Sequence, residues 1–250
     1  MEIKKASFCL PDDREKWIDF SPYDYSSDKY YSDITQELKK RRQNTGYTRI
    51  KLELKQRGAV SIRSYTVKNK DDILSADFVQ LSTNDGVPVI PGTSWAGAFR
   101  QRFFEFSGND KVFVDKIWGH VDTKNKTQSR SKIVFSESRL TDYVDKIITR
   151  NAIDRFSAGT KEGALYSEKT FYNGKCTLNI DIKNNIDSID RCMKILAAEI
   201  CDLDRGYLSI GGLTSIGRGL FSVERVTINN DDVTVAMKNA DIQGMIGGKA

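Results

Sequence analysis

The chain has 250 residues, of which 39% are apolar, so it is long enough for one large domain or two small ones with a packed core. Its longest apolar runs are far shorter than a membrane span, and its first residues lack the apolar stretch of a signal peptide, so we expect a cytoplasmic protein without membrane partners. Thirty-nine basic and 34 acidic side chains leave a net charge of +5, which permits nucleic-acid binding but does not by itself indicate it.

Residues 1–46 are polar and show little regular periodicity, and we expect them to form an extension packed on the core, with a short helix at residues 34–42. Alternation begins with Ile50, Leu52 and Leu54, which share one side of the next stretch while charged residues occupy the other. This pattern predicts the first half-buried strand of the core. A loop and a short strand are expected to follow.

Residues 87–104 predict a short strand, a Pro-Gly turn and then a helix. Trp95, Phe99 and either Arg102 or Phe103 recur at helical spacing, so one face of this helix is apolar.

The start of this helix is the first candidate binding site. Thr93 or Ser94 is the expected N-terminal cap. Free N–H groups and the positive end of the helix dipole form a seat for phosphate. An ordinary helix start is the alternative.

The segment between the two predicted helices contains both weak and strong indications of secondary structure. Residues 122–131 lack an apolar anchor and predict a mobile loop, whereas residues 133–135 start a strand. The clearest strand signal is the strict alternation from Cys176 to Ile182. With a turn at Asn173-Gly174, it predicts a β-hairpin arm over residues 170–182.

Residues 187–204 predict a second helix, with Asp187 or Ser188 as its cap. Strand signals follow at residues 220–226 and 233–235, and the C-terminal end is expected to fray.

The predicted order is β, α, β, β, α, β, which is the order of a ferredoxin-like fold and of RNA-recognition domains. The fold class is therefore α+β. We expect this domain to occupy residues 47–228, after the extension at 1–46 and before a tail at 229–250.

A glycine-rich stretch at residues 209–221 is the second candidate site, with glycines at 211, 212, 217 and 219. Such a loop lets backbone N–H groups approach a phosphodiester chain, because glycine has no Cβ and tolerates positive φ. It matches neither the Walker pattern nor a dinucleotide fingerprint. A flexible hairpin turn is the alternative.

The sequence gives little support for metal binding, disulfide bonding or catalysis by cysteine and histidine side chains. The only histidine is His120, and Cys9, Cys176, Cys192 and Cys201 include no Cys-x-x-Cys pair. The sequence predicts neither a metal site nor a disulfide framework, so we expect reduced thiols in packed positions. No Ser-His-Asp or Cys-His set can be assembled, and His120 is expected to be structural.

Three stretches together resemble the signature motifs of the RAMP superfamily, the repeat-associated proteins of CRISPR systems. Two of them are residues 90–100 (IPGTSWAGAFR) and residues 211–219 (GGLTSIGRG). The third, residues 152–160 (AIDRFSAGT) followed by GALY, Glu168 and Gly174, is similar to the middle motif of the backbone subunits of type III effector complexes. The three blocks lie in the family's order.

The resemblance implies a guide-RNA-binding backbone subunit of a type III CRISPR interference complex, with a thumb hairpin and inserted loops on a ferredoxin-like core. The implied partners are guide RNA, complementary target RNA and other effector subunits, with head-to-tail self-association. The residues expected to bind RNA are Thr93, Ser94 and Arg100 at the helix start, Arg155, Phe156 and Lys161 in the thumb, and Gly211, Gly212 and Arg218 in the glycine-rich loop.

The resemblance also implies a candidate catalytic residue. Asp77 lies a little upstream of the Pro-Gly motif, where such subunits carry the aspartate that cuts target RNA. A carboxylate beside a 2′-hydroxyl assists in-line attack on the adjacent phosphate, with Mg²⁺ or Mn²⁺ to offset charge and no tightly bound cofactor. A surface aspartate in a polar loop is the alternative.

One position departs from the family pattern. Ala96 stands where members usually carry a lysine or arginine that meets the guide backbone, and its loss removes one phosphate contact. A non-catalytic scaffold subunit therefore stays open as one alternative. A second alternative is a stand-alone RAMP endoribonuclease that processes guide precursors, which ranks lower because such enzymes generally use a histidine or a tyrosine and lysine set and His120 is the only histidine.

Overall fold

The computed structural model describes residues 7–10, 13–19, 46–64, 76–161 and 163–239. The chain divides into two compact units, Met1–Gly46 and Tyr47–Ala250. In the first unit, β1 (Ser7–Leu10) pairs antiparallel with β2 (Asp13–Asp19), a hairpin that the sequence did not predict. The helix expected at residues 34–42 lies outside the described residues.

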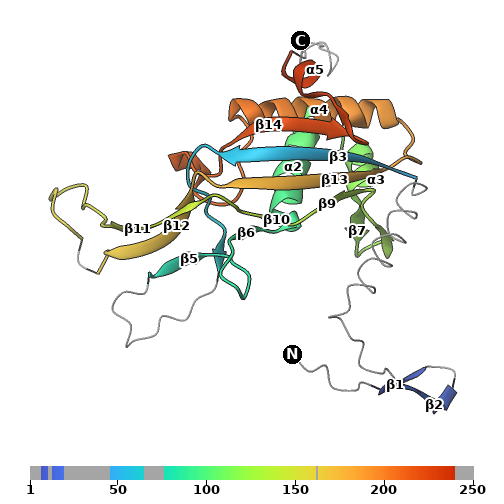
Figure 1. Ribbon diagram of the computed structural model, residues 1–250, viewed down its shortest axis with the longest axis horizontal. Coiled ribbons are helices and arrows are strands. Elements are labelled where there is room, and N and C mark those ends of the chain that lie inside the picture. The colour runs from blue at the N-terminus through green and yellow to red at the C-terminus, as the bar shows by residue number, and fades with distance from the viewer. Residues whose placement is uncertain (1–6, 11–12, 20–45, 65–75, 162, 240–250) are drawn as a thin grey trace. The chain divides into compact units, whose positions relative to one another are not determined.

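The centre of the second unit is a five-stranded antiparallel sheet with the order β15-β14-β3-β13-β9 (Figure 1). Its two long central strands, β3 (Tyr47–Gln56) and β13 (Lys175–Lys183), pair with each other over nearly their whole length. The remaining strands are β14 (Phe221–Ile228), β9 (Ile133–Phe135) and β15 (Asp231–Asp232). The predicted strands of the core are thereby confirmed.

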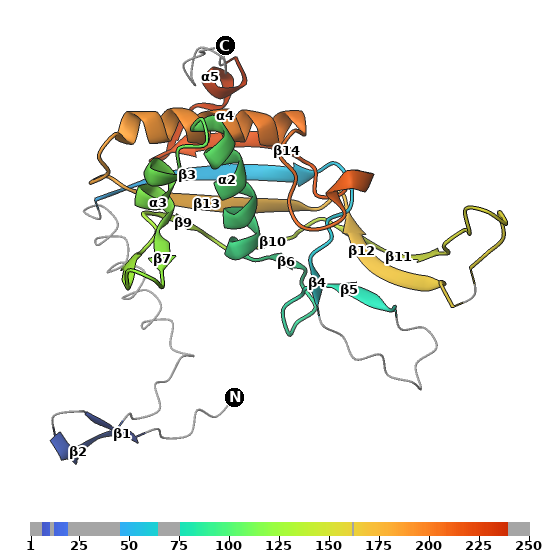
Figure 2. The ribbon, with the colours of Figure 1, turned by 180° about the vertical axis from the view of Figure 1, so that it is seen from behind.

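Two helices, α2 (Gly92–Phe106) and α4 (Ile189–Arg205), cover one face of this sheet, and α3 (Lys111–Trp118) follows α2 (Figure 2). The side chains of Trp95 and Phe99 are completely buried, as the helical spacing predicted.

The third position of the apolar face belongs to Phe103, which is also completely buried. Arg102 instead lies beside the carboxylates of Asp202 and Glu105, at N–O distances of 2.5 Å and 2.6 Å.

The helix starts differ from the predicted caps. Pro91 holds the N-cap position of α2, and no side chain caps the helix. The N–H group of Ser94 donates to the Pro91 carbonyl oxygen at 3.0 Å. Thr93 and Ser94 lie inside the first turn, because the helix begins earlier than expected. Ser188 does precede α4, but in a left-handed conformation without a side-chain cap bond.

A second sheet, with the order β11-β12-β5-β4, lies beside the core. Its strands are β11 (Val144–Arg150), β12 (Tyr166–Tyr172), β5 (Phe78–Gln80) and β4 (Arg63–Ser64). β11 and β12 pair antiparallel over their full length and, with residues 151–161 and 163–165 at the tip, form a projection that we call the arm (Figure 1).

The predicted hairpin over residues 170–182 is wrong, although its turn is present. Asn173, with φ of 59°, and Gly174 separate β12 from β13, but these two strands enter different sheets. The backbone oxygen of Gly174 accepts from the N–H of Gln56, and the Gly174 N–H donates to the Gln56 side chain, both at 2.8 Å. The turn is therefore fastened to β3, and the alternation reflects the burial of β13 in the central sheet.

Two smaller differences and one confirmed strand concern short elements. The expected loop at residues 122–131 contains part of a hairpin of β7 (His120–Asp122) and β8 (Thr127–Ser129). The expected strand at residues 233–235 is replaced by the start of helix α5 (Thr234–Lys238). β6 (Val89–Ile90), the strand before α2, pairs with β10 (Ser138–Arg139).

Three cysteines have described side chains, and all are buried and free of disulfides. Burial raises the pKa of Cys176 and of Cys192 to about 12, so both stay protonated thiols at neutral pH. Among the described residues, no helix has the length and apolar character needed to cross a bilayer.

Candidate nucleic-acid interface

Part of the first turn of α2 is accessible to solvent, whereas its first residue, Gly92, packs closely against the backbone of Phe135. Thr93 is exposed and Ser94 half-buried. A Cβ on Gly92 would lie 2.4 Å from the backbone oxygen of Phe135, so glycine is required for the approach of the helix to the end of β9. Ala96 packs partly against the core.

Arg100 lies on the exposed side of α2 and joins it to the end of α3. Its Nη2 is 3.5 Å from the Asp115 carboxylate and 3.3 Å from the carbonyl oxygen of Gly119. The side chain remains 47% exposed, so these contacts leave it within reach of a ligand.

Two glycines of the glycine-rich loop are needed for packing. A Cβ on Gly211 would lie 2.7 Å from the Ser61 oxygen, and one on Gly219 would lie 2.0 Å from the Ile210 oxygen. Both have positive φ. The N–H of Gly212 donates to the Ser61 oxygen at 2.7 Å, so it is already used within the protein.

Arg218 is not presented to solvent, in contrast to the predicted phosphate contact. Its side chain is 4% exposed, and Nη1 and Nη2 bind the two carboxylate oxygens of Glu168 at 3.0 Å and 2.8 Å. Thr170 Oγ1 lies 3.5 Å from Nη1. A buried guanidinium must be paired in this way, because an isolated charge is costly to desolvate. Arg218 therefore connects the glycine-rich loop to β12 of the arm.

The tip of the arm is an ordered turn with exposed side chains. The Asp154 carboxylate accepts the N–H groups of Phe156 and Ser157 at 2.8 Å and 2.9 Å, and these bonds hold its pKa below the usual range. Phe156 is 96% exposed. Arg155 and Lys161 are also exposed, so the three residues predicted for the thumb lie on one accessible tip.

Asp77 directly precedes β5 and is half-buried. Its Oδ2 accepts from the N–H of Ser167 at 2.7 Å and from the Ser167 hydroxyl at 3.1 Å. The carboxylate therefore fastens β5 to β12. Among the described residues, no group of three or more histidine, cysteine, aspartate or glutamate side chains is arranged to hold a metal ion.

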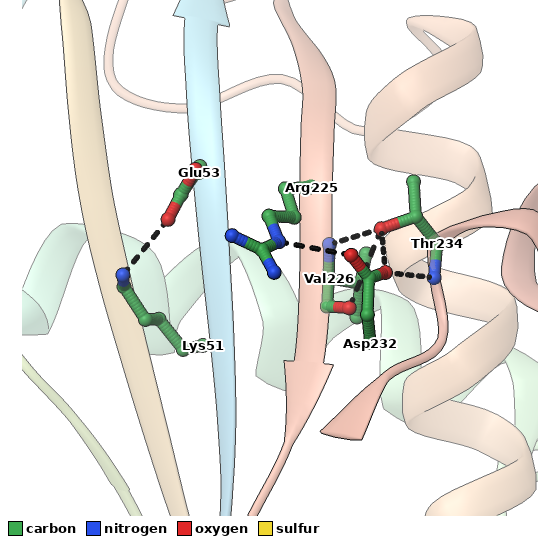
Figure 3. Close-up of polar contacts among 6 residues, drawn as sticks. All are labelled: Lys51, Glu53, Arg225, Val226, Asp232 and Thr234. Carbon is green, nitrogen blue, oxygen red and sulfur yellow. Dashed lines mark hydrogen bonds and ion pairs between the residues drawn. The ribbon is translucent and has the colours of Figure 1, made fainter. Parts of the chain in front are cut away.

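The open face of the five-stranded sheet, on the side away from α2 and α4, carries charges that pair with one another. Lys51 lies 2.8 Å from Glu53, and Arg225 lies 2.9 Å from Asp232 (Figure 3). Arg49 forms a further pair with Asp181 of β13 at 2.5 Å. RNA-recognition domains read bases from such a face with aromatic side chains, whereas these positions hold ion pairs.

The helix start and the glycine-rich loop are linked through the core. The rings of Trp95 and Phe221 lie 5.3 Å apart between centroids, and Phe221 follows the loop directly. Because Arg218 and Glu168 join that loop to the arm, the three sequence motifs form one connected structure. The sequence did not identify Glu168 as the partner of Arg218, because the two residues lie 50 positions apart in the chain.

A family model described as the RAMP superfamily matches residues 72–222. The chain belongs to the RAMP superfamily. Among solved structures, this RAMP protein is similar to a chain in the cryo-EM structure of the type III-B Cmr-beta bound to cognate target RNA, with a TM-score of 0.56 and 17% sequence identity. The similarity covers 82% of this chain and 68% of that chain. No curated protein matches the sequence.

Proposed function

We propose that this chain is a guide-RNA-binding backbone subunit of a type III CRISPR interference complex. The observation that carries the proposal is the connection of the glycine-rich loop to the arm through Arg218 and Glu168 in a RAMP superfamily chain. The similar chain belongs to a complex bound to target RNA, which supports RNA as the ligand.

We further propose a ferredoxin-like classification for the core. The elements β3, α2, β9, β13, α4 and β14 follow one another in the order β, α, β, β, α, β. Their strands lie side by side in the order β14-β3-β13-β9. This arrangement supports a relationship with RNA-recognition domains.

RNA contact is expected at two places. The arm tip offers Phe156 for stacking on a base, with Arg155 and Lys161 for phosphate. The first turn of α2 offers the N–H group of Thr93, the hydroxyl of Ser94 and the positive end of a helix dipole to the guide backbone.

Target cleavage at Asp77 is the catalytic part of the proposal. The carboxylate would accept the proton of a 2′-hydroxyl, the 2′-oxygen would attack the adjacent phosphorus, and the 5′-oxygen would leave and take a proton from water, which yields a cyclic phosphate and a free 5′-hydroxyl. Mg²⁺ or Mn²⁺ would offset the developing charge. The bonds from Ser167 orient the carboxylate in the absence of RNA.

RNA recovered with the purified chain tests the proposal. Bound RNA of uniform length, with copies of the chain lined up head to tail along it, supports the backbone subunit. Cleavage of a free RNA hairpin supports a stand-alone endoribonuclease instead. Protein free of RNA that binds no added guide supports a scaffold, which the loss of a basic residue at Ala96 would explain.

A further inference from the structure

Four basic and aromatic side chains form a row across the second sheet, where the strands of the arm meet its tip. Arg150 of β11 stands opposite Tyr166 of β12 in the strand register. The ring of Tyr166 meets that of Phe78 of β5 edge to face, with 5.8 Å between centroids. The guanidinium carbon of Arg63 of β4 lies 3.9 Å from the centre of the Phe78 ring. We call these four residues the Arg–aromatic row.

The row lies on the same face of the sheet as the glycine-rich loop. Phe78 pairs with Glu168 in the register, so their side chains project to one side. Tyr166 shares that side, because it is two positions from Glu168. Glu168 binds Arg218 of the loop on this side. Asp77 precedes Phe78 by one position and therefore lies on the opposite side.

The four side chains of the row are at least partly accessible to solvent. Arg63 is exposed, whereas Phe78, Tyr166 and Arg150 are half-buried. Within the described ranges of the chain, neither Arg63 nor Arg150 takes part in an ion pair. Arg218, on the same face, is by contrast held by a carboxylate.

We propose that the Arg–aromatic row is a binding site for unstacked bases of single-stranded RNA, an inference that rests on the proposed function. A guanidinium that lies over a ring leaves its other face open to a base, and an adjacent aromatic ring extends the surface for stacking. Arg63 and Arg150 flank the two rings, so both can reach phosphates of the same strand.

The chemistry favours a single strand over other anionic ligands. An acidic peptide would pair with the two arginines but would make no use of the rings. A duplex presents phosphates but keeps the faces of its bases stacked. Stacking without hydrogen-bond readout tolerates any base, so the site suits a strand of variable sequence.

The test is binding of the full chain to a short unstructured RNA and to a duplex of the same length, at several salt concentrations. Phe78→Leu and Tyr166→Leu are each expected to weaken single-strand binding about ten-fold and to leave duplex binding unchanged. Arg63→Gln and Arg150→Gln are each expected to lower the salt slope by about 1. Arg205→Gln, an exposed arginine at the end of α4, is the matched charge control.

The outcomes separate the two proposals. If the parent binds single-stranded RNA and all four variants behave like Arg205→Gln, the row is not a site while the proposed function stands. If the parent binds no RNA, both proposals fail. Ultraviolet crosslinking of RNA to the unmodified chain guards against loss of folding in the variants: crosslinks at Phe78 or Tyr166 support the row, and crosslinks confined to residues 151–165 overturn it.

Discussion

The two terminal nitrogens of Arg218 bind the two carboxylate oxygens of Glu168, and each side chain is only 4% exposed. One residue belongs to the glycine-rich loop and the other to the arm. The pair therefore joins the glycine-rich loop directly to β12 of the arm.

Glu168→Gln should destabilise the fold by about 3–5 kcal/mol, because it leaves the Arg218 guanidinium buried without a counter-charge. Urea unfolding measures this loss. The double variant Arg218→Met/Glu168→Leu should lose less, since it removes both charges. An equal loss in the double variant would show that shape, not charge, dominates the site.

Arg218→Ala should weaken RNA binding without changing its salt slope, because the guanidinium is buried against Glu168 and holds the arm in place rather than facing a ligand. Filter binding at two or more salt concentrations measures both the affinity and the salt slope. A slope lower by about 1 would mean that Arg218 reaches a phosphate in the complex.

Gly219→Ala should destabilise the chain by more than about 1 kcal/mol, because the new Cβ would lie 2.0 Å from the Ile210 oxygen at a positive φ. Gly212→Ala is the matched control, since its Cβ would be 3.5 Å from the Ser61 oxygen. We expect that variant to stay within about 0.5 kcal/mol of the parent. Thermal unfolding of both variants gives the comparison.

Glu199 is completely buried on α4, and neither carboxylate oxygen has a hydrogen-bond partner among the described residues. Burial raises its pKa well above the usual value, although the charge of Arg102 acts in the opposite direction. The carboxyl thus ionises earlier in the unfolded chain, and stability should fall as pH rises above the ordinary glutamate range toward the raised folded pKa. Glu199→Met should flatten this fall.

At neutral pH, Glu199→Met should also stabilise the chain by about 1–3 kcal/mol, because it removes a buried polar group without a partner. Denaturant midpoints across pH measure both effects. The exposed Glu224→Gln serves as control. A parallel pH profile for parent and Glu199→Met would contradict the prediction.

Asp77→Asn should abolish divalent-dependent cleavage of complementary RNA and leave guide and target binding nearly intact, because the amide oxygen can still accept from Ser167. Gel analysis of a matched target under single-turnover conditions provides the measurement. Ser167→Ala keeps the carboxylate and should slow cleavage without abolishing it. Normal cleavage by Asp77→Asn would leave a binding subunit without this catalytic role.

Local periodicity accounts for the parts of the fold that the sequence predicted. β3, α2 and β13 each bury one regular face. The spacing of the apolar residues that begin with Ile50 in β3 and with Trp95 in α2 was therefore enough to predict a strand and a helix. The second sheet could not be found in this way. β4 and β5 span two and three residues, too few to show a period, and their pairing depends on distant strands.

The sequence was sufficient to predict an exposed side chain where one segment carries the whole motif, as at the arm tip with Phe156, whereas its contact with RNA stays a prediction. The sequence did not reveal the contacts that depend on a distant partner. Arg218 and Asp77 were both assigned to RNA from their motifs, yet each meets a residue of β12 that lies 50 and 90 positions away. Such partnerships depend on tertiary contacts that no local pattern records.

The short turn at Asn173-Gly174 limits how such a protein can vary in length. Because Gly174 is fastened to Gln56 and β13 begins at the next residue, one added residue there would shift β13 against β3 and turn its apolar side chains toward solvent. The described residues of the tip, 151–161 and 163–165, carry no comparable constraint from the central sheet. Relatives that need a longer or shorter reach along RNA should therefore gain and lose residues at the far end of the arm, while the spacing between β12 and β13 stays constant.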